Sequence, residues 1–211
     1  MISSSRTVLS FSGRSPFVPI SFRIALCLLL LSGTGSLRAQ TSQSRDSHAG
    51  LDLAFSYVGE RSLKAATGQN FWMQGGSVEL GIDFFHGLGV AAEIAGTHTG
   101  SIGTSGVPLS LVSITCGPRY RWHAGRRNSL YGEAMIGEAD GFQSLFPATS
   151  GSLTSSNNLA VQVGGGVDFQ LSNRFALRVD AAWVRTQLPN ATDNVQDTLR
   201  LGGGIAFHFG R

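Results

Sequence analysis

Seven acidic and four basic side chains recur at alternate positions within short segments of apolar and small residues. They are Asp52, Glu79, Asp83, Glu93, Arg119, Arg121, Glu133, Asp168, Arg178, Asp180 and Arg200. Residues two apart in a β-strand point to the same face of a sheet, so this spacing places the charges on one face. Buried charges persist only when they are paired. The pattern therefore predicts an internal network of ion pairs with an excess of acids.

The order of the segments suggests the partners within this network. Arg119 and Arg121 lie on a segment between those that carry Glu93 and Glu133, so we expect both arginines to point toward these two acids. Arg178 lies between the segments of Asp168 and Arg200. A structural network that fills the interior is one interpretation. A gated or leaky small pore is the other, and the acidic excess would then favour cations.

Patterns for other chemistry are weak. Residues 87–92 match G-x-G-x-x-A, but no acid follows between Glu93 and Glu133 and the flanking residues alternate with a period of two, so we expect no dinucleotide site. A hydrolase would need serine, histidine and an acid on one patch, and no histidine meets this condition; His98 is the one nearest a serine-rich stretch. Cys116 is the one cysteine outside the N-terminal segment, so we expect neither a disulfide nor a metal site. We expect no catalysis and no cofactor.

The elements that must position these charges alternate with a period of two, which indicates β-strands. Eight such segments occur, at 51–57, 77–84, 88–94, 112–122, 130–136, 159–169, 177–183 and 199–209. Long polar connections at 60–70, 98–108, 139–157 and 187–196 alternate with short turns at 86–87, 123–128 and 172–174. Tight turns at one end and long loops at the other are typical of a membrane barrel. We therefore predict an all-β fold, an eight-stranded antiparallel up-and-down transmembrane β-barrel over 50–211.

The face opposite the charges indicates whether the barrel is surrounded by lipid or by water. It consists of Leu, Val, Ile, Ala and aromatic residues, which suit lipid, whereas a barrel of eight strands has an interior just wide enough for side chains. Aromatic residues at strand ends predict two interfacial belts, formed by Tyr57, Trp72, Phe84, Trp122, Phe169, Phe175, Trp183 and Phe209. Phe142, Leu145 and Phe146 in the third long connection are expected either to pack over the barrel mouth or to contact a ligand, partner or surface. A soluble lipocalin-like binder is a weaker alternative.

The N-terminal 39 residues predict an export signal. Arg14 and Arg23 form a basic region before an apolar run of eight residues, Ile24 to Leu31, and Ala39 provides a small residue for cleavage before Gln40. Residues 40–49 then form a short periplasmic segment. Four of the 16 basic residues lie in the leader, which has no acid, so the remainder carries 12 basic and 13 acidic residues and a net charge of −1. This balance argues against nucleic-acid binding.

Three stretches carry a family resemblance: Gly117-Pro118-Arg119-Tyr120-Arg121, Ala176 to Asp180, and the end from Leu199 to Phe209. On these residues the chain resembles the small bacterial outer-membrane β-barrels and is similar to the OmpA transmembrane domain. The resemblance implies an outer-membrane location, contact with membrane lipid and lipopolysaccharide, assembly by the barrel-assembly machinery, and a monomer. It implies a structural, adhesion-like or porin-like role. A narrow cation-leaning pore and a lipid A-modifying enzyme are the alternatives.

Overall fold

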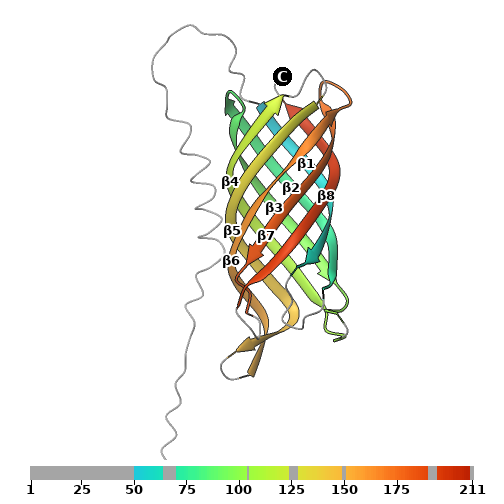
Figure 1. Cartoon of the computed structure of the whole chain (residues 1–211), viewed down its shortest axis with the longest axis vertical. Coiled ribbons are helices and arrows are strands. Elements are labelled where there is room, and N and C mark those ends of the chain that lie inside the picture. Colours follow the sequence, from blue (N-terminus) through green and yellow to red (C-terminus); the bar gives the residue numbers. More distant parts are fainter. Residues whose placement is uncertain are drawn as a thin grey trace, which may run out of the picture. The chain divides into compact units, whose positions relative to one another are not determined.

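The computed structural model describes residues 50–63, 70–103, 105–123, 128–148, 151–189 and 194–209. These residues form eight strands: β1 (Gly50–Ser62), β2 (Trp72–Phe85), β3 (Leu88–Thr99), β4 (Leu109–His123), β5 (Asn128–Ala148), β6 (Gly151–Gln170), β7 (Phe175–Thr186) and β8 (Gln196–Phe209). Each strand pairs antiparallel with the next, and β8 pairs with β1 to close the barrel (Figure 1). The predicted eight-stranded up-and-down barrel is confirmed. The expected leader and the segment 40–49 lie outside the described residues.

Side chains alternate between the lumen and the outer surface along every strand. On β1, for example, Asp52 and Ala54 are 3% and 2% exposed, whereas Phe55 and Tyr57 are 49% and 63% exposed. The large apolar residues that are exposed in the bare barrel thus form its outer face. Pairing of β8 with β1 removes the open edges of the sheet, which a lipid environment requires. No helix among the described residues is long and apolar enough to cross a membrane.

The short turns gather at one end of the barrel, here called the short-turn end, and the longer connections at the other, the long-loop end. The β2–β3 turn consists of His86 and Gly87, whose φ angles are 46° and 85°. Two successive left-handed residues form the turn type that matches the twist of a two-residue hairpin. A Cβ on Gly87 would also lie 2.2 Å from the carbonyl oxygen of Arg121, so glycine is required there.

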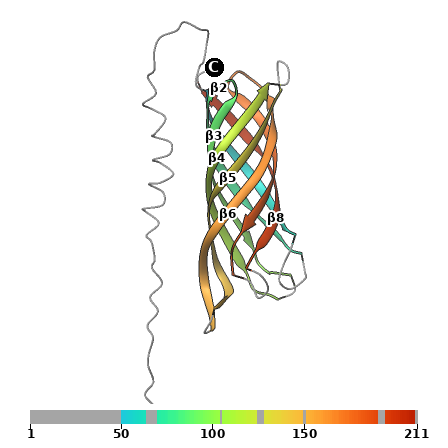
Figure 2. The ribbon, with the colours of Figure 1, turned by 60° about the vertical axis from the view of Figure 1, so that its left-hand side comes forward.

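The third long connection differs from the expected loop. Most of residues 139–157 continue β5 and β6 as a hairpin, with Ala148 paired to Gly151. The β4–β5 pairing stops at Phe142 and the β6–β7 pairing at Ala160, so the hairpin runs beyond its neighbours (Figures 1 and 2). The β6 half of this hairpin is rich in serine and threonine, and its backbone pairs with that of β5, which composition alone did not reveal. β1 likewise continues to Ser62, into the stretch expected to be the first long connection.

Candidate functional site

All eleven charged residues predicted to share one face line the barrel lumen. Nine of them are buried, and Asp83 and Asp180 are half-buried. One further acid and one histidine join them, Glu60 on β1 and His208 on β8, with exposures of 0% and 4%. In the described strands the lumen therefore holds eight acids, four arginines and one histidine. The interior is a charge-filled core.

A first set of ion pairs, the basal cluster, lies toward the short-turn end. It consists of Asp52, Glu79, Asp83, Arg119, Arg121, Asp168 and Arg178. Arg119 contacts Glu79 through Nη1 at 2.6 Å and Asp52 through Nη2 at 3.0 Å. Glu79 Oε1 also accepts a hydrogen bond from Arg178 Nη1 at 2.7 Å. Each acid of this cluster is thus held by at least two cations.

Asp168 and Asp52 tie the cluster together across the barrel. Arg178 binds Asp168 with Nε at 2.7 Å and Nη2 at 3.0 Å, a two-pronged contact between neighbouring strands. Arg121 reaches the same carboxylate with Nη1 at 2.8 Å and also contacts Asp52. His208 Nδ1 contacts the other oxygen of Asp52. Side chains from β1, β4, β6, β7 and β8 therefore meet in one layer.

The ring of Tyr131 lies among the three arginines of this layer. Its centroid is 4.5 Å from the guanidinium carbon of Arg178, 5.7 Å from that of Arg119 and 5.9 Å from that of Arg121. The ring keeps the three guanidinium groups apart, and its face attracts and stabilises their positive charges. Sequence reasoning placed Tyr131 on the same face as Glu133 but did not count it as part of the site. Its position two residues before Glu133 is the signal that could have included it.

The predicted partners of Arg119 and Arg121 are not the observed ones. Arg119 is opposite Glu133 in the β4–β5 register, yet its guanidinium turns toward β1 and β2. Gly81 on β2 supplies the space: a Cβ there would lie 1.7 Å from Arg119 Nη2. A long side chain in a narrow lumen can cross to a strand where a small residue leaves space. The prediction that Arg119 and Arg121 pair with the acids on the neighbouring strands was therefore wrong.

A second set, the distal cluster, lies farther toward the long-loop end around Arg200. This arginine contacts Glu60 through Nε and Glu93 Oε2 through Nη1, the latter at 3.1 Å. Gln162 Nε2 donates to Glu93 Oε2 at 2.7 Å and Gln162 Oε1 accepts from Arg200 Nη1 at 3.1 Å. Glu60 was assigned to a loop by its sequence, but β1 continues past it and turns it inward. It is the acid that sequence reasoning missed.

Glu133 and Asp180 differ from the other lumen acids. Within the described residues neither forms an ion pair with an arginine, and Glu133 Oε2 has no hydrogen-bond partner although the residue is 9% exposed. A Cβ on Gly202 would lie 2.3 Å from Asp180 Oδ2, so that glycine makes room for the carboxylate. The acidic excess of the lumen is therefore concentrated between the two clusters.

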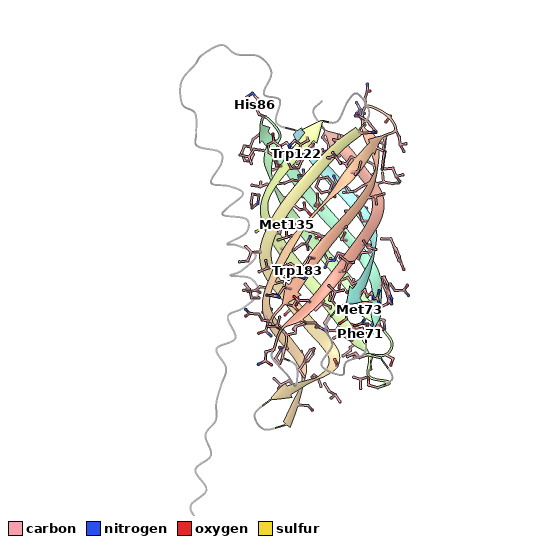
Figure 3. All side chains as sticks on the ribbon, in the orientation of Figure 1. Phe71, Met73, His86, Trp122, Met135 and Trp183 are labelled. Carbon is pink, nitrogen blue, oxygen red and sulfur yellow. The ribbon has the colours of Figure 1, made fainter. Side chains whose placement is uncertain are left out.

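Apolar side chains form a buried cluster at the long-loop end, and we call them the apolar plug. They are Phe71, Met73, Leu109, Leu111, Ala139, Phe146, Ala160 and Leu188. Figure 3 shows Phe71 and Met73 at this end, with His86 at the other. Of the three residues considered for external contacts, Phe146 is 6% exposed and packs into the plug, whereas Phe142 and Leu145 are 38% and 61% exposed.

The eight aromatic residues expected at the interfaces lie on the outer face. Phe84, Trp122, Phe169, Phe175 and Phe209 are toward the short-turn end, and Tyr57, Trp72 and Trp183 toward the other. Figure 3 shows Trp122 and Trp183 in different halves of the barrel. All are exposed except Trp183, which is half-buried and lies 4.8 Å from the guanidinium of Arg185.

One histidine does contact a serine. His98 Nδ1 lies 2.9 Å from Ser110 Oγ on the outer face of β3 and β4, and Ser110 Oγ donates to Gln143 Oε1 at 2.7 Å. A nucleophilic serine must give its hydrogen to the histidine, and here the acceptor is an amide. No acid completes the group among the contacts of the described residues. These residues also hold no cluster of histidine, cysteine and acid that could bind a metal ion.

The comparisons with known proteins agree with this architecture. The family model of the outer membrane protein beta-barrel domain matches residues 26–209. The structure is similar to that of Neisserial surface protein A, with a TM-score of 0.61 and 13% identity over 75% of this chain and 97% of that one. It is also similar to Ail, the attachment invasion locus protein of Yersinia pestis in complex with the heparin analogue sucrose octasulfate. That comparison has a TM-score of 0.53 and 20% identity over 77% of this chain and 99% of Ail.

No curated protein sequence matches the chain. At identities this low the two solved structures show the fold alone, whereas the family match is a match of sequence. The matched residues include every strand of the barrel. The chain therefore belongs to the outer membrane protein beta-barrel domain family and is a protein of the bacterial outer membrane.

Proposed function

We propose that the protein is a closed, non-conducting barrel with a structural or adhesion-like role at the cell surface. The observation that carries this proposal is the filling of the lumen from both directions. Four buried arginines cross the interior, each bound to at least two acids, and the apolar plug lies beyond them. Ions that leave water need replacement ligands, and a plug of Phe, Met and Leu offers none.

The hairpin beyond residue 142 is the part best placed to meet a partner. Leu145 and Leu153 are 61% and 53% exposed among serine, threonine and asparagine side chains. The long connections of a membrane barrel are on the external side. The hairpin would therefore present an apolar, nearly uncharged surface outside the cell.

A narrow pore that favours cations is the second candidate. The acidic excess of the lumen supports it, because Glu133 and Asp180 have no arginine partner among the described residues. A pore would require the plug to move, since the plug covers the path from these acids to the long-loop end. A lipid A-modifying activity has less support, because Ser110 donates its hydrogen to Gln143. Absence of catalysis stays a prediction.

Two measurements test the proposal. In planar bilayers with potassium chloride, the refolded wild-type barrel should give no stable conductance; a steady, cation-selective channel would contradict the closed interior and favour the pore. An epitope tag inserted between Ala148 and Gly151 tests surface display separately. Intact cells should bind the antibody, and labelling that appears after lysis alone would place the hairpin on the wrong side of the membrane.

A further inference from the structure

A notch lies on the outer face of β1, β2 and β3 near the long-loop end. Its cavity volume is about 480 Å³, in the range of small-ligand sites. The lining residues that matter here are Tyr57, Gly59, Trp72, Gln74, His98 and Gly100. Thr99 and Met73 complete the lining, and Met73 is shared with the apolar plug. The six residues named above belong neither to the charge clusters nor to the plug.

The strand register explains why the surface is hollow at this place. Gly59, Gln74 and His98 form one cross-strand row, and the next outward-facing row toward the short-turn end contains Tyr57, Gly76 and Gly96. Glycine in three of these positions leaves the wall between the aromatic rings open. A Cβ on Gly59 would meet no atom nearer than the Trp72 ring at 3.8 Å, which shows the free space directly.

The notch has two aromatic walls and oriented polar groups. Tyr57 and Trp72 are 63% and 56% exposed, and the Tyr57 hydroxyl donates to Gln74 Oε1 at 2.7 Å. That bond fixes the Gln74 amide so that its NH₂ group is available to a ligand. Flat aromatic faces beside hydrogen-bonding groups suit a ring that is apolar on its faces and polar at its edge, such as a sugar.

The side chain of His98 is also oriented. The single hydroxyl hydrogen of Ser110 goes to Gln143 Oε1, so the hydrogen bond between Ser110 and His98 is donated by His98 Nδ1. In the neutral imidazole Nε2 is then an acceptor, which can bind a ligand hydroxyl. The hydrogen bond to Ser110 therefore positions the His98 ring.

A cation lies at the edge of the notch. Arg61 is exposed, and its guanidinium carbon lies 5.9 Å from the centre of the Trp72 ring. Within the described residues no acid forms an ion pair with Arg61, in contrast to Arg185, which binds Asp197. A guanidinium without a carboxylate partner favours phosphate, which it binds through paired hydrogen bonds.

The surface on the membrane side of the notch is apolar. Phe55, Val78 and Ile94 form the next outward-facing row, and they are 49%, 41% and 55% exposed. A polar notch that opens directly onto this row suits an amphiphile with its head in the notch and its chains on the barrel wall. The long-loop end faces the outer leaflet in a barrel of this kind.

We propose that the notch binds the phosphorylated sugar headgroup of an outer-leaflet glycolipid. Tyr57 and Trp72 contact the faces of the sugar ring, Gln74 and His98 bind its hydroxyl groups, and Arg61 binds the phosphate. The acyl chains lie along Phe55, Val78 and Ile94. The inference is independent of whether the lumen conducts.

Native mass spectrometry of the folded barrel in detergent can test this, with lipid A, dephosphorylated lipid A and phosphatidylglycerol as probes. Gly59→Leu fills the notch without a backbone clash. Gly132→Leu is its matched control, because a Cβ there would lie 3.5 Å from the ring of Trp122 at the opposite end. Arg61→Ala removes the cation, and Arg174→Ala removes an exposed arginine from the short-turn end.

The wild type should bind lipid A in preference to both other probes. Gly59→Leu and Arg61→Ala should each weaken lipid A binding about tenfold, the effect of losing roughly one charge-assisted hydrogen bond or its equivalent in contact. The two control variants should bind like the wild type. Equal losses in variant and control, or no loss in either, would overturn the site. Equal binding of phosphatidylglycerol would overturn the assignment to a sugar headgroup. The gel shift between unboiled and boiled samples confirms that each variant is folded.

Discussion

Arg119 connects three acids of the basal cluster, so its removal should weaken the whole layer. The side chain is 0% exposed and contacts Asp52, Glu79 and Asp83. Breaking one buried ion pair typically costs about 3–5 kcal/mol, because a charge is left without a partner. Here each acid keeps a second arginine, Arg121 or Arg178. We therefore expect Arg119→Ala to lower the free energy of unfolding by about 3 kcal/mol, the lower end of that range.

Urea unfolding in detergent micelles measures this loss, and Cys116→Ala is the control on the same strand. Cys116 faces outward, where detergent or lipid fills the space left by the sulfur, so the expected cost is at most about 0.8 kcal/mol, the value of one methylene-sized group. If Arg119→Ala were as stable as Cys116→Ala, the basal cluster would contribute no stability through Arg119, and the account of the lumen as a core of paired charges would be wrong.

Three further outcomes are expected. Glu133→Gln should unfold at a urea concentration equal to or above that of the wild type, because Glu133 has, among the described residues, no arginine partner to lose. Glu79→Gln should unfold at a lower urea concentration, because Glu79 binds two arginines, and the reverse order would contradict the assigned partners. Phe146→Ala should lower stability by up to about 3 kcal/mol through the cavity it leaves in the plug, measured by the same titration, and a cost near zero would show that Phe146 is not packed there. Mass spectrometry of the intact mature protein should give a chain that begins at Gln40, and a chain in the membrane fraction that begins at Met1 would refute the predicted cleavage.

The faces of the strands could be predicted because the period of two is a local property. Once Arg119 and Arg121 are known to share a face with Gly117, the alternation on β4 follows without knowledge of any other strand. The same rule places Tyr131 and Glu133 together on β5. The register that pairs the strands is likewise constrained, since a slip by one residue would turn every charge toward lipid.

The partners and the strand ends could not be predicted, because they depend on the closed barrel. Arg119 bypasses Glu133 on the neighbouring strand for Glu79 and Asp52, since Gly81 leaves space on β2. Glu60 lies in a polar stretch that no local pattern marks as a strand, and its burial follows from pairing with β2 and β8.

The central claim is that the lumen is closed, and thiol labelling tests it most directly. In a Cys116→Ala background, Thr115→Cys places a thiol at an inward position that is 1% exposed, between the two charge clusters. Leu145→Cys places one on the exposed hairpin as a positive control. A membrane-impermeant cationic thiol reagent should label position 145 in the folded barrel but label position 115 after unfolding in urea only. Rapid labelling of Thr115→Cys in the folded barrel would show a continuous aqueous path and contradict the closed lumen.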